Sequence, residues 1–522
     1  MTHTTDPASG AGQQRKDAHA SRERGVKGEH TKEGGGRKGL HRRKFLGGVA
    51  GAAGLAAVGA AGAVFSLLTE GNSNRAAAAD GTLTIPELLE GTTSDGTTTY
   101  TLEAQTGTSE VLSGVTSSTA GYNQSFLGPT MKWTKGDVVA LDITNGLDEE
   151  TTVHFHGAHV PPSMDGGPQN AFSAGATWEP TFTVLDEAKT LWYHPHALGT
   201  TAKQAVHGLA GMIIVEDDSD VSAALPSEYG VDDIPLIFQC LAVDSAGDIK
   251  YDQTGYLSSG LSFPVLVNGT NVDDTTLGFT ATKTRTRFRA LNASPSDIIT
   301  LQRSDGGTLT QIATEQGYLT EAAEVTTIRL VAGSRAEFVM DVTEDVTLQV
   351  VITTGWIRGG SGTFDFLTVN AGGTDTPDDL PSTLNTIERY DTSDFTARTI
   401  TLSNTGATMK INGSAGLTMS SMAMISTTLG AKEIWTVTNA SQLEHSFHLH
   451  DVPYQLVSIN GEAPTGVDLG WRDTYEVVGG GTIVIAMEFT DFADDTYMYM
   501  LHCHLLQHED EGMMASLMVT ES

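Results

Sequence analysis

The sequence predicts an all-β protein built from consecutive β-sandwich domains. Past residue 80, short β-rich runs alternate with turns rich in Gly, Asp, Asn, Ser and Thr. No long stretch shows the apolar periodicity of an amphipathic helix. One strand pattern occurs three times along the chain, and 522 residues suffice for three domains of ordinary size.

The first 79 residues are interpreted as an export signal. They carry 12 of the 30 Lys+Arg residues but only 6 of the 64 Asp+Glu residues. The pair Arg42-Arg43 precedes a Gly/Ala-rich apolar run over 47–68, and small residues follow at 76–79. This order resembles a twin-arginine signal with its cleavage site. We expect the twin-arginine machinery to export the protein to a periplasmic, cell-wall associated or extracellular location.

The apolar run of the signal is long enough to span a bilayer, so retention as an anchor is the alternative to cleavage. Its Gly/Ala content makes it a poor permanent anchor, and no stable membrane anchor is expected. Beyond residue 79, 18 basic residues face 58 acidic ones, a formal charge of −40. Such a chain does not suit nucleic acid or anionic membrane as a partner.

Only two cysteines are present, so no disulfide framework is expected despite the export signal. Cys240 follows the apolar run 234–239 and is interpreted as a buried, inert thiol. Cys503 lies among histidines and is a candidate metal ligand.

The repeated unit is a strand that ends in Asn, at 135–145, 287–292 and 433–439. Nine residues after the Asn, the first and third copies have a His-x-His pair, whereas the middle copy has Leu301-Gln302-Arg303. Metal ligands are therefore predicted in the outer two modules only. We place the domains at 80–222, 223–380 and 381–522, with linkers near 217–220 and 372–381.

Twelve histidines lie beyond residue 79, and ten of them fall in four clusters. The clusters are His154/His156, His194/His196, His445/His448/His450 and His502/His504/His508. Two histidines separated by one residue on a strand share a face and can bind a metal together. Four such pairs would supply eight imidazoles, which suits three copper ions between the first and third modules.

The last cluster also contains a second type of site. If the segment before His504 is a strand, His502 and His504 point one way and Cys503 points the other. A cysteine with two histidines and a weak thioether is the ligand set of a blue-copper electron-transfer site. The peptide around Cys503 would therefore connect two metal centres.

Together, the motifs resemble the signatures of the three-domain multicopper oxidases, which include laccases, bilirubin oxidases and copper-efflux oxidases. The motifs are His154-Phe155-His156-Gly157, His194-Pro195-His196, His445-Ser446-Phe447-His448-Leu449-His450 and the run from His502 to Met513. The resemblance covers nearly the whole chain after the signal. It implies three cupredoxin-like Greek-key domains, four coppers, and substrate oxidation coupled to the reduction of O₂ to water.

Carried over by position, the resemblance implies a ligand set for each copper. The type 1 site would take His445, Cys503 and His508, with Met513 as the axial ligand and Met514 as the alternative. The type 2 copper would take His154 and His448. The type 3 pair would take His156, His194, His196, His450, His502 and His504.

Two carboxylates, Asp165 and Glu509, resemble the acidic residues that feed protons to the reaction in this family. The alternative for each is a structural or surface carboxylate. His159 and His207 have no partner at ligand spacing and are interpreted as hydrogen-bonded bystanders.

The reducing substrate stays open at this stage, between phenols or aromatic amines and cuprous ion. Copper-efflux oxidases carry a long methionine-rich insert, which this chain lacks before His445. Met419, Met422 and Met424 form either a cuprous-ion path or ordinary packing.

Two other functions compete with the oxidase. A copper nitrite reductase also uses cupredoxin modules but needs no three-copper cluster. A copper-binding scaffold of the cell envelope, without turnover, would be a relative that lost its metal, yet no ligand is missing here. A chain with three modules of its own favours a monomer.

Overall fold

The computed structural model describes residues 81–252, 255, 258–273, 275–353 and 362–521. The predicted export signal, 1–79, lies outside these residues. The described chain consists largely of strands, as predicted, and its α-helices are short: α1 (Thr201–Val206), α2 (Asp220–Ala223) and α4 (Leu506–Asp510). Within the described ranges, no helix combines the length and the apolar character needed to cross a membrane.

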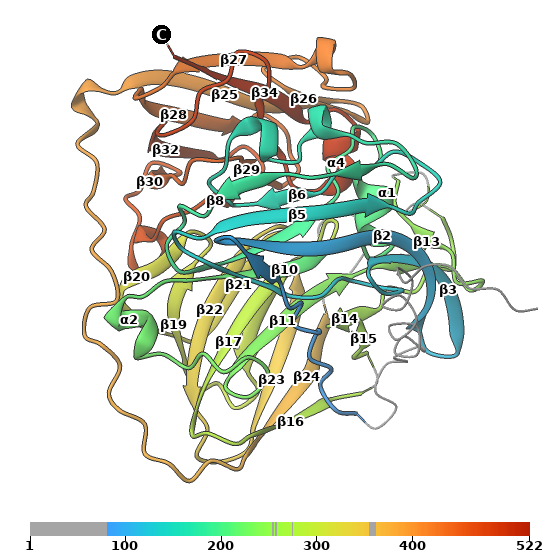
Figure 1. Cartoon of the computed structure of the whole chain (residues 1–522), viewed down its shortest axis with the longest axis vertical. Helices are drawn as coiled ribbons and strands as arrows, with labels where there is room; N and C mark the ends of the chain where they lie inside the picture. The colour runs from blue at the N-terminus through green and yellow to red at the C-terminus, as the bar shows by residue number, and fades with distance from the viewer. Residues whose placement is uncertain (1–80, 253–254, 256–257, 274, 354–361, 522) are drawn as a thin grey trace, which may run out of the picture. The chain divides into compact units, whose positions relative to one another are not determined.

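Three pairs of sheets follow one another along the chain (Figure 1). The first pair comprises β1 (Thr92–Ser94), β2 (Thr97–Leu112), β3 (Val115–Tyr122), β4 (Met131–Thr134), β5 (Val138–Asn145), β6 (His154–His156), β7 (Thr177–Trp178), β8 (Thr181–Thr183), β9 (Lys189–His194) and β10 (Gly211–Glu216). The four-stranded sheet of this pair has the order β4-β10-β9-β6, which makes β6 an edge strand. Trp133, Leu141 and Phe155 belong to the core that both sheets bury.

The second pair is the largest. It comprises β11 (Asp233–Cys240), β14 (Val265–Val267), β15 (Thr270–Asn271), β16 (Leu277–Ala281), β17 (Arg285–Asn292), β18 (Ile298–Arg303), β19 (Leu309–Thr314), β20 (Gly317–Val325), β21 (Thr327–Leu330), β22 (Arg335–Asp341), β23 (Val346–Thr353) and β24 (Gly362–Ala371), beside the hairpin β12 (Ala242–Val243) and β13 (Ile249–Lys250). Its core includes Leu236, Phe366 and Cys240. Cys240 is buried and forms no disulfide, as predicted.

The third pair carries most of the candidate ligands. It comprises β25 (Thr396–Thr405), β26 (Thr408–Ile411), β27 (Ala423–Thr428), β28 (Lys432–Asn439), β29 (His445–Leu449), β30 (Gln455–Ile459), β31 (Thr474–Val477), β32 (Thr482–Glu488), β33 (Tyr499–Cys503) and β34 (Met514–Thr520). One of its sheets has the order β27-β34-β33-β29-β31, so the two histidine strands, β33 and β29, are neighbours. Short 3₁₀ turns complete the chain: η1 (Pro162–Met164), η2 (Pro168–Asn170), η3 (Thr392–Asp394), η4 (Met419–Ser421) and η5 (Gly466–Leu469).

The three repeats of the sequence correspond to β5, β17 and β28. Each pairs in parallel with an earlier strand of its own module, β2, β11 and β25 respectively. The three strands therefore hold equivalent positions in the three sheet pairs. The predicted boundaries near 222 and 380 stay predictions.

The Asn that ends each repeat fixes the loop that follows it. The Asn145 side chain donates to the carbonyls of Glu149 and Phe172, and its own oxygen accepts from Leu147 N–H at 3.0 Å. Asn292 and Asn439 make the same kind of contacts, with two or more carbonyls and the N–H two residues ahead. Buried backbone groups of an irregular loop are satisfied in this way. The loop then delivers β6, β18 or β29 at a fixed place.

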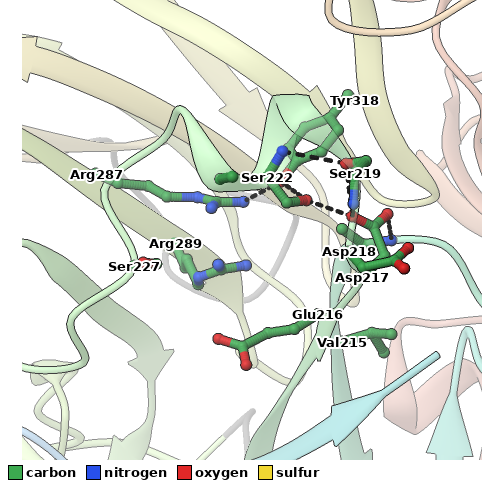
Figure 2. A pocket seen from close by; sticks show the side chains of 12 residues that line it. Val215, Glu216, Asp217, Asp218, Ser219, Ser222, Ser227, Arg287, Arg289 and Tyr318 are labelled. Atoms are coloured by element: carbon green, nitrogen blue, oxygen red, sulfur yellow. Dashed lines mark hydrogen bonds between the residues drawn. The ribbon is translucent and has the colours of Figure 1, made fainter.

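The predicted linker near 217–220 packs on the second module through α2. Ser219 and Ser222 both donate to Asp217, and the Ser222 hydroxyl lies 3.1 Å from the Tyr318 hydroxyl (Figure 2). Arg287 and Arg289 line the small pocket beside this turn. Both guanidiniums are paired, with Glu337 and Asp233, so the pocket offers no uncompensated positive charge.

Candidate metal centre

Eight imidazoles from the first and third modules converge in one buried cluster, as the sequence predicts. They belong to β6, β9, β29, β33 and the residues just after these strands: His154, His156, His194, His196, His448, His450, His502 and His504. In register, His154 pairs with His194 across β6 and β9, and His448 pairs with His502 across β29 and β33. The two modules thus present the same arrangement twice.

The two halves meet through ring stacking. The ring of His154 stacks on that of His450 with centroids 3.9 Å apart, and His156 stacks on His448 at 3.7 Å. His504 completes the group, with its ring centroid 4.9 Å from that of His156 and 5.2 Å from that of His194. Histidines of both modules are therefore required to form the cluster.

Backbone carbonyls fix the orientation of several rings. Nδ1 of His154 lies 2.7 Å from the Asp165 carbonyl, Nδ1 of His194 lies 2.8 Å from the Pro195 carbonyl, and Nδ1 of His448 lies 2.9 Å from the Asp473 carbonyl. Since a carbonyl only accepts, each Nδ1 carries the proton, and each Nε2 is a bare acceptor. These three Nε2 atoms are buried, and no described residue donates a hydrogen bond to them. A metal ion satisfies such nitrogens, and outer hydrogen bonds of this kind are typical of metal-bound histidines.

A second group of nitrogens gives stronger evidence that the cluster fits a metal ion. Nε2 of His502 lies 3.1 Å from Nε2 of His196 and 3.3 Å from Nε2 of His450. The Nδ1 atoms of these three rings face oxygens of Glu509 and Asp165. Three acceptor lone pairs at this separation repel one another unless a cation lies among them. The residues therefore fit a bound metal ion.

Cys503 lies on the other side of β33, within a separate ligand group. Its Sγ is 3.5 Å from Nδ1 of His445 and 3.6 Å from Nδ1 of His508, and these two nitrogens are 3.1 Å apart. Burial raises the pKa of the thiol to about 12. A soft metal ion would reverse this by stabilising the thiolate. Cys503 forms no bond with Cys240.

The two candidate axial methionines lie on opposite faces of the chain. Met513 is fully buried and packs in the same core as Cys503. Met514 packs instead against Met422 and Met500. Met513 is therefore on the thiol side of the sheet, and its role as the axial ligand stays a prediction.

Burial keeps several of the candidate ligands neutral. It lowers the pKa of His445 to about 4, and the pKa values of His450 and His508 to about 3. Burial, reinforced by neighbouring imidazoles, lowers the pKa of His194 and His504 well below 6.5. A neutral imidazole is the form that binds metal, so these five histidines can bind a metal ion at neutral pH.

Asp165 and Glu509 both lie against the cluster rather than at the surface, and both are buried. Asp165 Oδ2 accepts from Nδ1 of His450 at 2.7 Å. Glu509 lies 3.3 Å from Nδ1 of His196 and 3.2 Å from Nδ1 of His502. Burial acts to raise the pKa of Glu509, but the neighbouring His196 and His502 outweigh it and hold this pKa at about 2.

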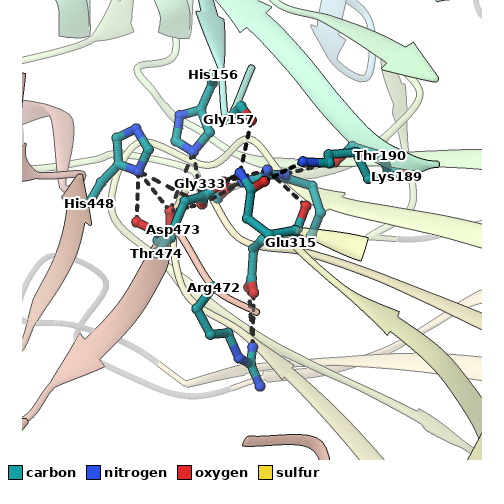
Figure 3. A network of polar contacts seen from close by, with 12 residues as sticks. His156, Gly157, Lys189, Thr190, Glu315, Gly333, His448, Arg472, Asp473 and Thr474 are labelled. Atoms are coloured by element: carbon teal, nitrogen blue, oxygen red, sulfur yellow. Dashed lines mark hydrogen bonds and ion pairs between the residues drawn. The ribbon is translucent and has the colours of Figure 1, made fainter. Parts of the chain in front are cut away.

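A third buried carboxylate, Asp473, escaped the sequence analysis. Its Oδ1 lies 3.5 Å from Nε2 of His156, and both of its oxygens bind the Arg335 guanidinium, at 2.8 and 2.7 Å (Figure 3). Burial opposes ionisation of Asp473, but Arg335 outweighs it and lowers the pKa of the carboxyl. Arg335 comes from β22 of the second module, which supplies no histidine. The pairing of residues 138 positions apart has no signature in sequence spacing.

The remaining predicted residues lie outside both ligand groups. His159 bridges Asp451 at 2.6 Å and Asp491 at 3.0 Å, and Nδ1 of His207 bonds the Lys203 carbonyl. Both histidines are hydrogen-bonded, as predicted. Met422 is buried, whereas the side chain of Met424 is 61% exposed.

Comparison with known proteins supports the geometry. Sequence models described as multicopper oxidase match residues 103–220 and 379–522. A multicopper oxidase of Staphylococcus aureus is 31% identical to this chain, and the alignment covers 84% of this chain and 92% of the Staphylococcus aureus protein. The cell division protein FtsP of Escherichia coli is 32% identical to this chain, and the alignment covers 78% of this chain and 86% of FtsP. The crystal structure of a laccase from Pediococcus acidilactici superposes with a TM-score of 0.75 and 30% identity, covering 85% of this chain and 95% of the laccase.

Proposed function

This chain belongs to the multicopper oxidase family and is a copper-dependent oxidase; from that premise we propose that it couples four one-electron oxidations of a substrate to the reduction of O₂ to two waters. The single observation that carries the proposal is the position of Cys503. Its sulfur belongs to one ligand group, and its neighbours His502 and His504 belong to the other. A few covalent bonds therefore connect the two groups.

Four copper ions would be held by these residues. His445, Cys503, His508 and Met513 would bind the type 1 ion. His154 and His448 would bind the type 2 ion. The type 3 pair would be held by His156, His194, His196, His450, His502 and His504. Bound copper supplies reversible one-electron chemistry and a place for O₂ to bind.

The chain itself contributes three things. The buried core around Cys503 and Met513 excludes water and limits rearrangement of the ligands. The peptide from Cys503 to His502 and His504 offers the shortest covalent path between the two groups. Stacked rings from two modules hold the histidines at fixed separations.

Reduction of O₂ to water consumes protons, and we assign their delivery to Asp165 and Glu509. Each carboxylate is buried, ionised and within 3.3 Å of the Nδ1 atoms of two cluster histidines. Each could therefore pass protons along beside the histidine cluster without leaving its place.

The substrate we propose is a phenol or aromatic amine, as the laccase likeness suggests, with cuprous ion as the second candidate. A role in copper tolerance would follow from the second. The likeness to a cell division protein leaves one other function to consider, the cell-envelope scaffold without turnover. The complete set of converging ligands argues against it, because a scaffold without turnover needs none of them.

We also propose export through the twin-arginine machinery and a monomeric state outside the cytoplasm. The arginine pair before the apolar run supports the first proposal. Three modules that bury both ligand groups within one chain support the second.

One experiment tests the function directly. The purified protein is loaded with copper, and copper per chain, visible absorption, O₂ uptake and oxidation of a laccase dye are measured together. Four coppers per chain, a blue colour and one O₂ consumed per four electrons are expected. A protein that binds copper without consuming O₂ would instead be a scaffold, and a stoichiometry of two with nitrite reduction would identify a nitrite reductase.

A further inference from the structure

Methionines gather on the face of the third module that carries the histidine cluster. The chain has 15 methionines, and five of them pack together at one place. They are Met419, Met422, Met498, Met500 and Met514. Leu198, two residues after His196 in the first module, packs against the same group. The methionines thus lie where the first and third modules meet.

The strand register makes this group continuous with the imidazoles. Met500 and His502 are two residues apart on β33 and therefore share a face, opposite to Cys503. Across the sheet, Met514 pairs with His502, and His502 pairs with His448. The thioethers of Met514 on β34 and Met500 on β33 thus form a row that ends beside the imidazoles of His502 on β33 and His448 on β29.

Exposure changes along the row. Met424 on the edge strand β27 is 61% exposed, and its register partner Ser516 faces Met500 on β33. Met419 and Met498 are half-buried, and Met500 and Met514 are completely buried. The row therefore runs from the surface to the cluster.

The backbone is adapted to this packing at one position. A Cβ added to Gly416 would meet the Met514 carbonyl oxygen at 2.4 Å and Met422 Cγ at 3.1 Å. Any other residue at 416 would lift the loop that carries Met419 and Met422 away from Met514. On the first-module side, Met498 N–H donates to Gln169 Oε1 at 2.9 Å, which fixes that end of the row.

We propose that these methionines form a binding site for cuprous ion through which the copper-free protein loads its histidine cluster. Thioethers are soft ligands that select Cu(I) over Cu(II), whereas the imidazoles further in bind copper more strongly. A cuprous ion that enters at Met424 or Met419 would pass inward from thioether to thioether and end on His502. Loading involves no electron transfer, since the ion keeps its charge throughout. The inference rests on the proposed function, because it needs a cluster that binds copper.

The site is distinct from the ligand group around Cys503. Cys503 and Met513 lie on the opposite face of the sheet, within the core of the third module, and His445 lies beside the Cys503 sulfur. Packing alone does not require sulfur, because leucine fills nearly the same volume as methionine. Replacement by leucine therefore removes the thioethers and leaves the packing in place.

The test compares the wild type with a triple variant, Met419→Leu, Met422→Leu and Met500→Leu. Copper-free protein receives Cu(I) from a competing chelator without oxygen, or Cu(II) in a parallel run. Copper per chain is then measured over time after gel filtration. We expect at least tenfold slower uptake of Cu(I) by the triple variant and an unchanged rate with Cu(II). The control, Met340→Leu, changes a methionine in the core of the second module and should load like the wild type.

A second measurement locates the ion. Ag(I), a redox-inert substitute for Cu(I), is added to the copper-loaded protein, in which copper already occupies Cys503. X-ray absorption should report sulfur neighbours around silver in the wild type and fewer in the triple variant, which keeps Met498 and Met514. Only nitrogen or oxygen neighbours in the wild type would overturn the proposal.

The other outcomes are equally decisive. Equal slowing with Cu(I) and Cu(II) would reveal structural damage, and no slowing would leave the thioethers without this role. A tenfold loss of steady-state Cu(I) oxidation by the fully loaded variant would make the row a substrate site instead. Failure of the wild type to take up four Cu(II) ions would overturn the proposed function itself, and this inference with it.

Discussion

The imidazole rings of His156 and His448 stack with centroids 3.7 Å apart, although 292 positions separate them in the sequence. One ring comes from β6 of the first module and the other from β29 of the third. The cluster of candidate ligands is therefore also a contact between the first and third modules.

Removal of copper should weaken that contact. Bound metal stabilises the folded chain by mass action, about 3 kcal/mol at a hundredfold excess over the dissociation constant. For a chain of this size we expect the unfolding temperature of the copper-free protein to fall by about 5 °C or more. Hydrogen exchange should accelerate in β6 and β29 but not in β17. Uniform acceleration across all three strands would contradict a local role of the metal.

Replacement of the thiol should abolish electron entry. Cys503→Ser removes the soft ligand proposed for the type 1 ion, so the blue colour should vanish and dye oxidation should fall at least a thousandfold. Absorption and steady-state kinetics measure both effects. Cys240→Ala, the matched change in the core of the second module, should keep colour and activity. Wild-type turnover by Cys503→Ser would disprove the mechanism.

Neutralisation of Asp165 should separate proton delivery from metal binding. Asp165→Asn keeps an oxygen that accepts from Nδ1 of His450, so copper content should stay at the wild-type level. The amide cannot carry a proton, and we expect kcat to fall about a hundredfold. The decisive readouts are kcat with an unchanged KM for the dye and an altered dependence of kcat on pH. An unchanged kcat would leave Asp165 as a positioning group only.

The asparagine contacts allow a matched pair of variants. Asn439→Ala removes bonds to the carbonyl of Leu443, in the loop that leads to His445, and to that of Val477 at the end of β31. Asn292→Ala removes the equivalent bonds in the second module, which carries no candidate ligand. Each should cost about 2–3 kcal/mol in free energy of unfolding, because buried carbonyls lose their donor. Only Asn439→Ala should change the visible spectrum. A spectral change in Asn292→Ala would contradict this division.

The buried histidines predict how stability depends on pH in the copper-free protein. The pKa values of His445, His450 and His508 are about 4, 3 and 3 in the folded chain, against about 6.5 when unfolded. Between these values the unfolded chain binds more protons, so the free energy of unfolding rises with pH up to about 6.5. Each histidine contributes about 2 kcal/mol between pH 5 and 7.

Urea unfolding of the copper-free protein at pH 5, 6, 7 and 8 measures this dependence. Stability should climb from pH 5 to 7 and then level off between pH 7 and 8. A flat profile from pH 5 to 7 would mean that these histidines titrate normally in the folded chain.

Sequence spacing predicted most of the ligand geometry because ligand pairs are local. His154 and His156 share a face through simple strand alternation, and the same rule places Cys503 opposite His502. The repeated Asn strand predicted which modules carry ligands. The meeting of the outer two modules followed from counting imidazoles, since neither module alone supplies enough.

Contacts between distant segments could not be predicted from the sequence. Asp473 has no histidine or cysteine beside it, and only the pairing of β31 with β29 brings it next to His448. The one available signal was its position directly before a strand of the ligand-bearing module. His159 was correctly interpreted as hydrogen-bonded, but its partners Asp451 and Asp491 lie about three hundred residues away.

Through Arg335, the second module contributes to the candidate metal centre although it carries no candidate ligand. The guanidinium binds Asp473 of the third module and also donates to the carbonyls of Thr190, in the first module, and Glu315, in the second. All three modules therefore meet at this one side chain. A shortened enzyme made by fusing only the outer two modules would keep every candidate ligand. It would lose Arg335, however, and leave the buried Asp473 carboxylate beside His156 and His448 without its cation. Engineers who shorten this oxidase must therefore transplant a cation along with the histidines.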